Sequence, residues 1–361
     1  MSFIRLNGVE KEYKTKRKQT DKRQRFCIRS IDLSIKKGEF FTLLGPSGCG
    51  KTTILKLVAG LLRPDRGDIC IENKEVTRVP PEQRGVSMVF QEALLFPHMT
   101  VGENISFGLK MKKINKRERT ERANDFLKLV GLEGMNLAYP SQLSGGQKQR
   151  VSLARALVTK PEILLMDEPF SALDPGTREE MRRLLKKLHR ELDITILFVT
   201  HDREEAFELS DRVAVLKNGK ILEVGMPKDL YERTDTVDVA EFLGLRNIYY
   251  GIVYEQKFSC DAFQLQLLNY EAIDVTKGWL VIRPETLSIQ KDNINTETNS
   301  QYLQGTMMDI SYKGSFYNLN VQVGNENLYI IQDTGTEFTF VKGGIVWIGI
   351  DSTKLHFIKE I

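Results

Sequence analysis

Short, uninterrupted apolar runs alternate with longer helical patterns in the first two thirds of the chain. The apolar runs span Phe40–Leu44, Ile163–Met166 and Ile194–Thr200, and such runs are expected of strands that are buried on both faces of a sheet. Between them lie helical stretches such as Thr120–Val130 and Arg178–Leu192. Strands that alternate with helices predict an α/β domain with a largely parallel central sheet.

The pattern changes after about Leu243-Gly244 to short segments in which apolar and polar residues alternate. The clearest are Asn318–Val323, Leu328–Gln332 and Gly344–Ile350, with turn residues such as Gly324-Asn325 between them. This pattern is typical of an all-β domain, and we expect a small barrel. The sequence therefore predicts two domains, residues 1–240 and 245–361. At 361 residues the chain is long enough for each to bury its own core.

Composition agrees with a globular protein, since 41% of the residues are hydrophobic and 28% are charged. The apolar stretch Gly343–Ile350 falls far short of the ~20 residues that a membrane-spanning helix needs. The N-terminal residues MSFIRLNGVEKEY show no basic-then-apolar signal pattern, so we expect the protein in the cytoplasm. The four cysteines are scattered, and none has another cysteine or a histidine nearby in the spacing of metal ligands. We therefore expect reduced thiols.

Charge is unevenly spread along the chain. Residues 245–361 carry nine Lys/Arg and thirteen Asp/Glu, whereas the whole chain has a net charge of +4. The segment Lys11–Arg25 is a local basic run with no aromatic residue beyond Tyr13. A solvated loop is a better interpretation of this segment than a nucleic-acid-binding arm.

A phosphate-binding loop is predicted at residues 45–52, which read GPSGCGKT and fit G-x-x-x-x-G-K-[ST] at every fixed position. The loop follows an apolar run and precedes a helical stretch, so its N–H groups and the positive end of the helix would face the phosphates. Lys51 would lie between the β- and γ-phosphates, and the Thr52 hydroxyl would coordinate Mg²⁺. The residues expected to bind ATP here are Gly45, Pro46, Ser47, Gly48, Cys49, Gly50, Lys51, Thr52 and Thr53. A glycine-rich turn without a ligand is the alternative, and a kinase, GTPase, helicase or transporter motor could each use such a loop.

A second acidic site is predicted where the run ILLM ends in Asp167 and Glu168. Ligands bind at the carboxyl edge of parallel sheets, so Asp167 would belong to the Mg²⁺ shell and Glu168 would activate water as a general base. Taken alone, the same residues could be a strand followed by a polar turn. The segment LSGGQ, residues 143–147, lies shortly before them and adds weight to the functional interpretation.

The order of these motifs resembles that of the ABC-transporter ATPases. LSGGQ is followed by KQRVSLARAL, the ILLMDEP strand, SALD at residues 171–174, and THD at residues 200–202. The resemblance implies a homodimer in which Ser144, Gly145, Gly146 and Gln147 bind the γ-phosphate held by the other protomer's loop. It further implies that Gln91 reaches Mg²⁺ and the attacking water, that His201 contacts the γ-phosphate, and that Asp174 communicates across the dimer. Asp202 is expected to be a helix N-cap rather than a catalytic group.

The aromatic residue that stacks on adenine is expected to be Tyr13. The basic run after it is longer than the family's usual spacing, so Phe26 or another residue is the alternative. The family also implies a helical subdomain at about residues 92–145, whose apolar entry LLFPH at residues 94–98 would receive a coupling helix from the membrane permease.

The tail resembles the TOBE domain, a transport-associated oligonucleotide/oligosaccharide-binding fold. The resemblance rests on VIRPE at residues 281–285 and on Gly305–Val323, which includes Tyr312-Lys313-Gly314. It implies the motor of a bacterial importer for an oxyanion such as molybdate, tungstate or sulfate, for ferric ion, or for a polyamine. The motor would sit on the cytoplasmic face of the membrane with a separate permease and, indirectly, a solute-binding protein. The acidic tail gives no reason to expect nucleic acid.

Two alternatives to this assignment stay open. A sugar importer would have a longer tail, and non-transport ABC ATPases of DNA repair or translation usually carry coiled coils or paired cassettes. An independent kinase or GTPase would leave LSGGQ unexplained.

Overall fold

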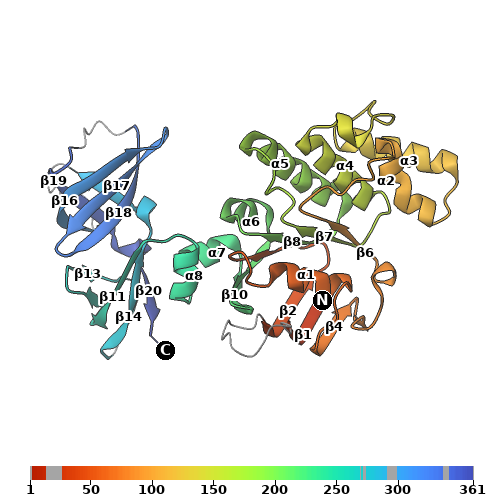
Figure 1. Cartoon of the computed structure of the whole chain (residues 1–361). Coiled ribbons are helices and arrows are strands. Elements are labelled where there is room, and N and C mark those ends of the chain that lie inside the picture. The colour runs from red at the N-terminus through yellow and green to blue at the C-terminus, as the bar shows by residue number, and fades with distance from the viewer. Residues whose placement is uncertain are drawn as a thin grey trace, which may run out of the picture. The chain divides into compact units, whose positions relative to one another are not determined.

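The computed structural model describes residues 2–13, 27–268, 270, 274–290, 299–335 and 341–360. The chain divides into two compact units, Met1–Pro227 and Lys228–Ile361 (Figure 1). Most of the basic segment 11–25, together with Phe26, lies outside the described residues. Within the described residues no helix is both long enough and apolar enough to span a bilayer. All four cysteines are free thiols, as predicted.

The first unit is built on a six-stranded sheet. Five of its strands run parallel, and the sixth, β10, pairs antiparallel with β9 at one edge. In spatial order they are β10 (Lys220–Gly225), β9 (Arg212–Lys217), β3 (Phe40–Leu44), β8 (Thr195–Thr200), β7 (Ile163–Asp167) and β6 (Val86–Val89). The three predicted apolar runs are therefore β3, β7 and β8, and the predicted α/β class is confirmed.

Alternate residues of these strands belong to two separate cores. Phe40 and Leu164 pack on one face, while Phe41 and Leu165 pack on the other. All five residues of β3 are buried, which explains why its sequence is apolar without alternation.

One face of this sheet is covered by helix α1 (Lys51–Ala59) and an antiparallel sheet, which share a core with it. The antiparallel sheet has the order β2 (Cys27–Lys36), β1 (Ser2–Glu12), β4 (Arg66–Ile71) and β5 (Lys74–Glu75). Helices cover the other face, and α2, α3 and α4 pack on one another as the helical subdomain. These helices are α2 (Val101–Met111), α3 (Lys116–Leu129), α4 (Gly145–Leu157), α5 (Pro175–Leu192) and α6 (Arg203–Leu209), with short 3₁₀ turns η1 (Pro81–Gln83) and η2 (Pro140–Gln142).

The second unit consists of two five-stranded antiparallel sheets that enclose one apolar core. One sheet has the order β13 (Gln264–Gln266), β12 (Lys257–Ser259), β11 (Asn247–Tyr254), β14 (Thr276–Ile282) and β20 (His356–Lys359). The other has the order β15 (Leu287–Gln290), β19 (Ile345–Asp351), β16 (Ser300–Tyr312), β17 (Phe316–Val323) and β18 (Glu326–Asp333). The turns η3 (Pro284–Thr286) and η4 (Ser352–Lys354) complete the unit.

The two units divide earlier in the chain than the expected boundary between residues 240 and 245. Helices α7 (Pro227–Glu232) and α8 (Val237–Phe242) lead into the β unit, where Ala240 and Leu245 pack on Val281 and Ile358. The expected first domain, residues 1–240, includes the start of α8, but the apolar side of α8 is buried against strands β14 and β20.

Candidate nucleotide-binding site

The predicted phosphate loop connects the end of β3 to the start of α1. Gly50 is the N-cap of α1 and has a φ of 113°, a conformation that residues with a Cβ rarely adopt. A Cβ on Gly45 would lie 2.4 Å from the carbonyl oxygen of Leu216, so β9 approaches the loop too closely for a side chain. Within the loop, Cys49 is buried, and burial raises the pKa of its thiol. This residue is therefore a packed structural thiol rather than a reactive one.

Lys51 lies over the loop rather than in solvent, and only 3% of it is exposed. Its Nζ donates hydrogen bonds to the carbonyl oxygens of Gly45 at 2.7 Å and Pro46 at 3.0 Å. It also lies 3.7 Å from Oε1 of Glu168. The ammonium group is therefore held between the loop and the acidic end of β7.

Thr52 and Asp167 are joined directly, although 115 positions separate them in the sequence. The Thr52 hydroxyl donates to Oδ1 of Asp167 at 2.7 Å. Burial raises the pKa of Asp167, and this hydrogen bond only partly opposes the effect. The described residues hold no group of three or more His, Cys, Asp or Glu that could bind a metal by themselves. A cation that prefers oxygen ligands would need further ligands at this site, from water or from phosphate.

Glu168 follows Asp167 in a left-handed conformation with a φ of 44°. Its backbone N–H donates to the carbonyl of Val199 at 2.9 Å, which ties the turn to the end of β8. Its Oε2 lies 2.9 Å from Nδ1 of His201. One carboxylate thus contacts both the Lys51 ammonium and the His201 ring. Backbone strain at a residue placed between two polar groups is typical of a functional position.

Tyr13 lies beside the same helix start. It follows β1 directly, and its hydroxyl is 3.3 Å from Oγ1 of Thr53 on α1. Its ring is 39% exposed. Of the two aromatic candidates, the structure therefore brings Tyr13 to the loop, whereas Phe26 lies outside the described residues.

The segment LSGGQ forms the start of α4. Ser144 is the N-cap, and its hydroxyl accepts from the N–H of Gln147, whose side chain accepts from the N–H of Ser144. A Cβ on Gly146 would lie 2.5 Å from Cγ2 of Thr177 on α5, so this position packs α4 against α5. The N-terminus of α4 offers free N–H groups and a positive dipole, which suit an anion.

Asp174 and Asp202 are both helix N-caps. Asp174 accepts from the N–H of Thr177 at the start of α5, and hydrogen bonds with the side chain and the N–H of Thr177 lower the pKa of its carboxyl group. Asp202 accepts from the N–H groups of Glu204 and Glu205 at the start of α6, as predicted. The role expected for Asp174 between protomers concerns a partner chain and stays a prediction.

Gln91 begins a partly exposed loop after β6, residues 91–99, which the half-buried Arg155 and the buried Asn104 fasten to helices. Arg155 on α4 donates to the carbonyl oxygens of Leu94 at 2.9 Å and Ala93 at 3.0 Å. Asn104 on α2 is fully buried, and its side chain bonds the N–H and the carbonyl of Phe96 and the carbonyl of Met99. Neither residue was predicted from the sequence. A signal for Asn104 was present, because it is a polar residue beside Val101 and Ile105 on the buried side of α2.

The apolar loop residues face different ways. Leu94 has a φ of 41° and is 56% exposed, whereas Leu95 packs against the core that includes the helical subdomain. Phe96 contacts Phe107, with ring centroids 4.7 Å apart. Of the two leucines, the one available to a partner is Leu94.

Comparison with known proteins agrees with this geometry. Residues 28–171 match the family model described as "ABC transporter", and residues 280–358 match the TOBE domain. The "Spermidine/putrescine import ATP-binding protein PotA" of Mesoplasma florum is 41% identical over 96% of this chain and 95% of its own length. The chain belongs to the ABC transporter family. It is an ATP-binding subunit of that family and an ATPase.

Other relatives differ in the solute that their names give. The "Sulfate/thiosulfate import ATP-binding protein CysA" of Bacillus cereus is 40% identical over 99% of this chain and 98% of its own length. The "Fe(3+) ions import ATP-binding protein FbpC" of Pasteurella multocida is 42% identical over 84% of this chain and 86% of its own length.

Among solved structures, the dimeric ATP-binding cassette MJ0796 bound to ADP and Pi, in a post-hydrolysis state, superposes with a TM-score of 0.55. It is 35% identical in sequence, and the match covers 62% of this chain and 98% of that one. The predicted family, fold class and ATPase activity are therefore confirmed.

Proposed function

We propose that this subunit hydrolyses ATP as a head-to-tail homodimer and thereby drives solute uptake through a separate membrane permease. The observation that carries the proposal is the set of contacts that joins Lys51, Glu168 and His201 at one end of the parallel sheet. The phosphate loop lies at the same end, where ligands bind in folds of this kind.

Hydrolysis needs a water molecule in line with the bond between the γ-phosphorus and its bridging oxygen. Glu168 accepts a proton from this water as it attacks, the bond to the bridging oxygen breaks, and ADP and phosphate leave. His201 holds the Glu168 carboxylate in place and reaches the γ-phosphate. Lys51 and the loop N–H groups stabilise the charge on the phosphate oxygens.

Thr52 and Asp167 are suited to Mg²⁺, which prefers oxygen ligands and keeps waters and substrate phosphates in its shell. A hydroxyl and a carboxylate at hydrogen-bond distance supply two such oxygens, and Gln91 is the third protein group assigned to this shell. When bound, the ion neutralises charge on the β- and γ-phosphates. Tyr13 stacks on the adenine ring, at the position where its hydroxyl reaches Thr53.

Each site is completed by the partner protomer in this proposal. Ser144, Gly145, Gly146 and Gln147 present the N-terminus of α4 to the γ-phosphate held by the opposite loop, and Asp174 lies at the dimer contact. The dimeric state of the MJ0796 cassette supports this arrangement.

The permease binds the loop at residues 91–99 and the helical subdomain, so the subunit works at the cytoplasmic face of the membrane. The solute is an oxyanion, ferric ion or a polyamine, the classes to which the names of its relatives point. No part of the mechanism needs nucleic acid.

The test compares Glu168→Gln with a mixture of Lys51→Ala and Ser144→Arg chains. Glu168→Gln should bind ATP, lose ~10²–10⁴-fold in turnover, and accumulate as an ATP-bound dimer in size-exclusion chromatography. Each single mutant should be inactive as a homodimer, whereas the mixed dimer should keep one intact site. Normal turnover of Glu168→Gln would remove this residue from its role, and normal turnover of both homodimers would exclude the composite site.

A further inference from the structure

The turn that carries His201 is fixed on both sides of the histidine by hydrogen bonds. Thr200 is buried at the end of β8, and its hydroxyl donates to Oε2 of Glu205 at 2.6 Å. The N–H of Asp202 donates to the same hydroxyl at 3.0 Å, and Oδ1 of Asp202 caps α6. The backbone before and after His201 is therefore held by Glu205 and Asp202.

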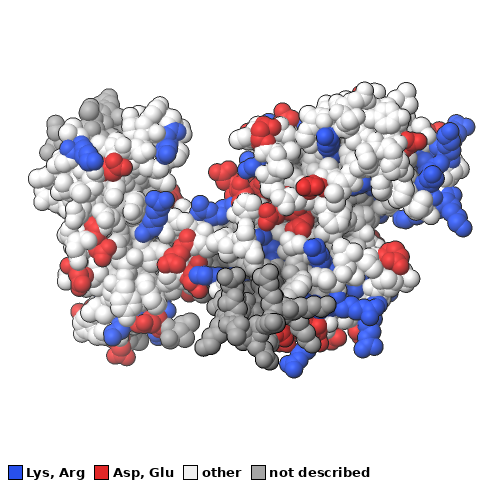
Figure 2. Space-filling view, in the orientation of Figure 1, with Lys and Arg blue, Asp and Glu red and all other residues white. Residues whose placement is uncertain are grey.

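Glu205 is a carboxylate placed where a negative charge is costly. Only 3% of the residue is exposed, and burial raises the pKa of its carboxyl group, with a smaller contribution from Asp202. Acidic side chains are also visible on the surface around α5 and α6 (Figure 2). The hydrogen bond from Thr200 and the charges of Arg178 and Arg182 oppose the rise in this pKa. Cations from α5 therefore favour the ionised form of Glu205.

Arg178, near the start of α5, is one of these cations, and it reaches two further groups. Its Nε lies 3.9 Å from Oε1 of Glu205, which is too far for a hydrogen bond, and its Nη1 donates to Oδ2 of Asp202 at 3.4 Å. Its Nη2 donates to the carbonyl oxygen of Leu173 at 3.2 Å. A planar guanidinium can bond two acceptors at once in a fixed geometry. One side chain thus joins the segment before α5 to the turn before α6.

These contacts form a circuit that begins and ends at Glu168. The N–H and the hydroxyl of Ser171 both donate to the carbonyl oxygen of Glu168, at 3.3 Å and 3.0 Å, so the segment before α5 is tied to the backbone of this residue. The carboxylate of Glu168 is held by His201 at 2.9 Å. Arg178 completes the circuit, because it bonds both the segment that follows Glu168 and the turn that carries His201.

We propose that Arg178 is a positioning residue, which keeps His201 in contact with Glu168 and makes this contact depend on the segment before α5. The inference rests on the proposed function, which assigns Glu168 as the general base and Asp174 to the dimer contact. When the partner protomer displaces Asp174, the guanidinium carries the displacement to the turn of His201. Arg178 therefore links closure of the dimer to the alignment of the base.

The experiment is a double-mutant cycle on the full-length chain, with steady-state ATP turnover as the measurement. Arg178→Ala should lower kcat roughly 10–100-fold and leave the KM for ATP within about twofold, because misplacement of a catalytic group lowers the rate without removing the contacts that bind the nucleotide. His201→Ala should lower kcat at least as much. Arg178→Ala added to His201→Ala should cost less than about twofold more, since the side chain that it positions is then absent.

Arg178→Lys separates positioning from compensation of charge. Its ammonium group keeps a positive charge beside Glu205 but lacks the fixed fork that bonds two acceptors. We expect it to restore most of the melting temperature that Arg178→Ala loses, while kcat stays low. If Arg178→Ala does not fold, Arg178→Lys takes its place in the cycle with His201→Ala.

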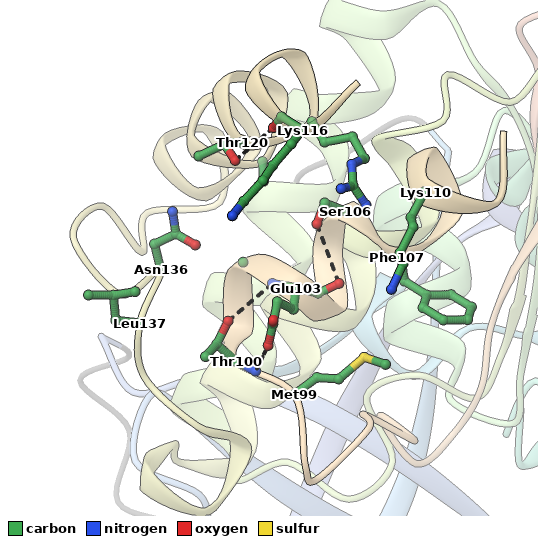
Figure 3. Close-up of a pocket in the computed structure, with 13 residues that line it drawn as sticks. Met99, Thr100, Glu103, Ser106, Phe107, Lys110, Lys116, Thr120, Asn136 and Leu137 are labelled. Carbon is green, nitrogen blue, oxygen red and sulfur yellow. Dashed lines mark hydrogen bonds between the residues drawn. The ribbon is translucent and has the colours of Figure 1, made fainter. Parts of the chain in front are cut away.

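Two controls remove a cation from other positions. Arg182→Ala takes the same charge from α5 near Glu205, but Arg182 pairs with Glu208 on α6 at 2.6 Å. Lys116→Ala removes a cation that lines a cavity of about 340 Å³ between α2 and α3, in the helical subdomain (Figure 3). Both should leave the kcat of the isolated subunit unchanged.

Three results would overturn the proposal. Wild-type kcat in Arg178→Lys would assign Arg178 to compensation of the Glu205 charge alone. An equal loss of kcat from Arg178→Ala with and without His201 would mean that it acts through another group. An equal loss in Arg182→Ala would trace the effect to the charge of α5. The proposed function fails in a different way, because wild-type turnover of His201→Ala would remove the histidine from the mechanism itself.

Discussion

Removing the Arg155 side chain should release the loop that follows Gln91 without disturbing ATP binding. Arg155 donates two hydrogen bonds to loop carbonyls and lies over the Phe96 ring, 5.8 Å from its centroid. A hydrogen bond from a charged group contributes about 1.5–3 kcal/mol when buried, and a cation–π contact about 0.5–2 kcal/mol. Leu94 is largely exposed, so water replaces part of what is lost. We expect Arg155→Ala to lower the free energy of loop opening by about 2 kcal/mol.

The assay is hydrogen exchange of the loop amides in the nucleotide-free protein. The N–H of Phe96 is suited to it, because Oδ1 of Asn104 accepts from it at 2.8 Å. A change of about 2 kcal/mol corresponds to a roughly 30-fold faster exchange of this amide if it exchanges through loop opening. Arg155→Lys keeps the charge but not the paired geometry, so it should give an intermediate rate.

The control is Arg150→Ala on the same helix. Arg150 bonds the carbonyl of Val130 and pairs with Glu180, so its loss should affect the end of α3 and not residues 91–99. Unchanged exchange at Phe96 in Arg155→Ala would refute the view that this residue fastens the loop. Equal acceleration in Arg150→Ala would refute its specificity.

Three further predictions concern the nucleotide site and the unit boundary. Because burial raises the pKa of Asp167 above its ordinary 3.8, the ionised form destabilises the fold, and this cost grows as pH rises from the ordinary pKa to the raised one and is constant above it. Asp167→Asn should therefore raise the melting temperature of the nucleotide-free protein at pH 7, yet abolish the extra stabilisation that Mg²⁺ gives with ATP; a lower melting temperature would contradict the burial argument. Tyr13→Phe should keep ATP affinity and Tyr13→Ala should weaken it about tenfold in fluorescence titration, whereas equal affinity of all three would exclude stacking. Truncation after Pro227 should give a more soluble ATP-binding unit than truncation after Gly244, which leaves Ala240 without its partners Val281 and Ile358; equal solubility would argue against the boundary.

Features encoded by neighbouring residues could be predicted from the sequence. The phosphate loop needs Gly50 at a positive φ between a buried strand and a helix, and all three parts are contiguous. The N-cap Asp202 was predicted, and the caps Ser144 and Asp174 are equally local, since each cap bonds N–H groups two or three positions ahead. Buried strands were equally clear, because β3, β7 and β8 are apolar on both faces.

Features that depend on distant residues could not be predicted in this way. Arg155 meets Ala93 and Leu94 across about sixty positions, and the pattern around it is that of an ordinary amphipathic helix. Leu94 and Leu95 are identical in type, yet Leu94 has a left-handed backbone and is exposed, whereas Leu95 packs inward. The packing of α8 with the second unit is a feature of the same kind, because it depends on strands that come later in the chain.

Helix α4 connects two parts that the proposed mechanism needs. Ser144 caps its start, where the partner protomer's ATP would bind, and Arg155 near its end holds the 91–99 loop. The same helix packs on α2 of the helical subdomain. A packed helix moves as a rigid element, so we expect a displacement of Ser144 on ATP binding to move Leu94 as well. Without Arg155, ATP would still close the dimer, but a displacement of α4 would move the 91–99 loop less. Coupling to the permease should therefore fall more than ATP turnover does.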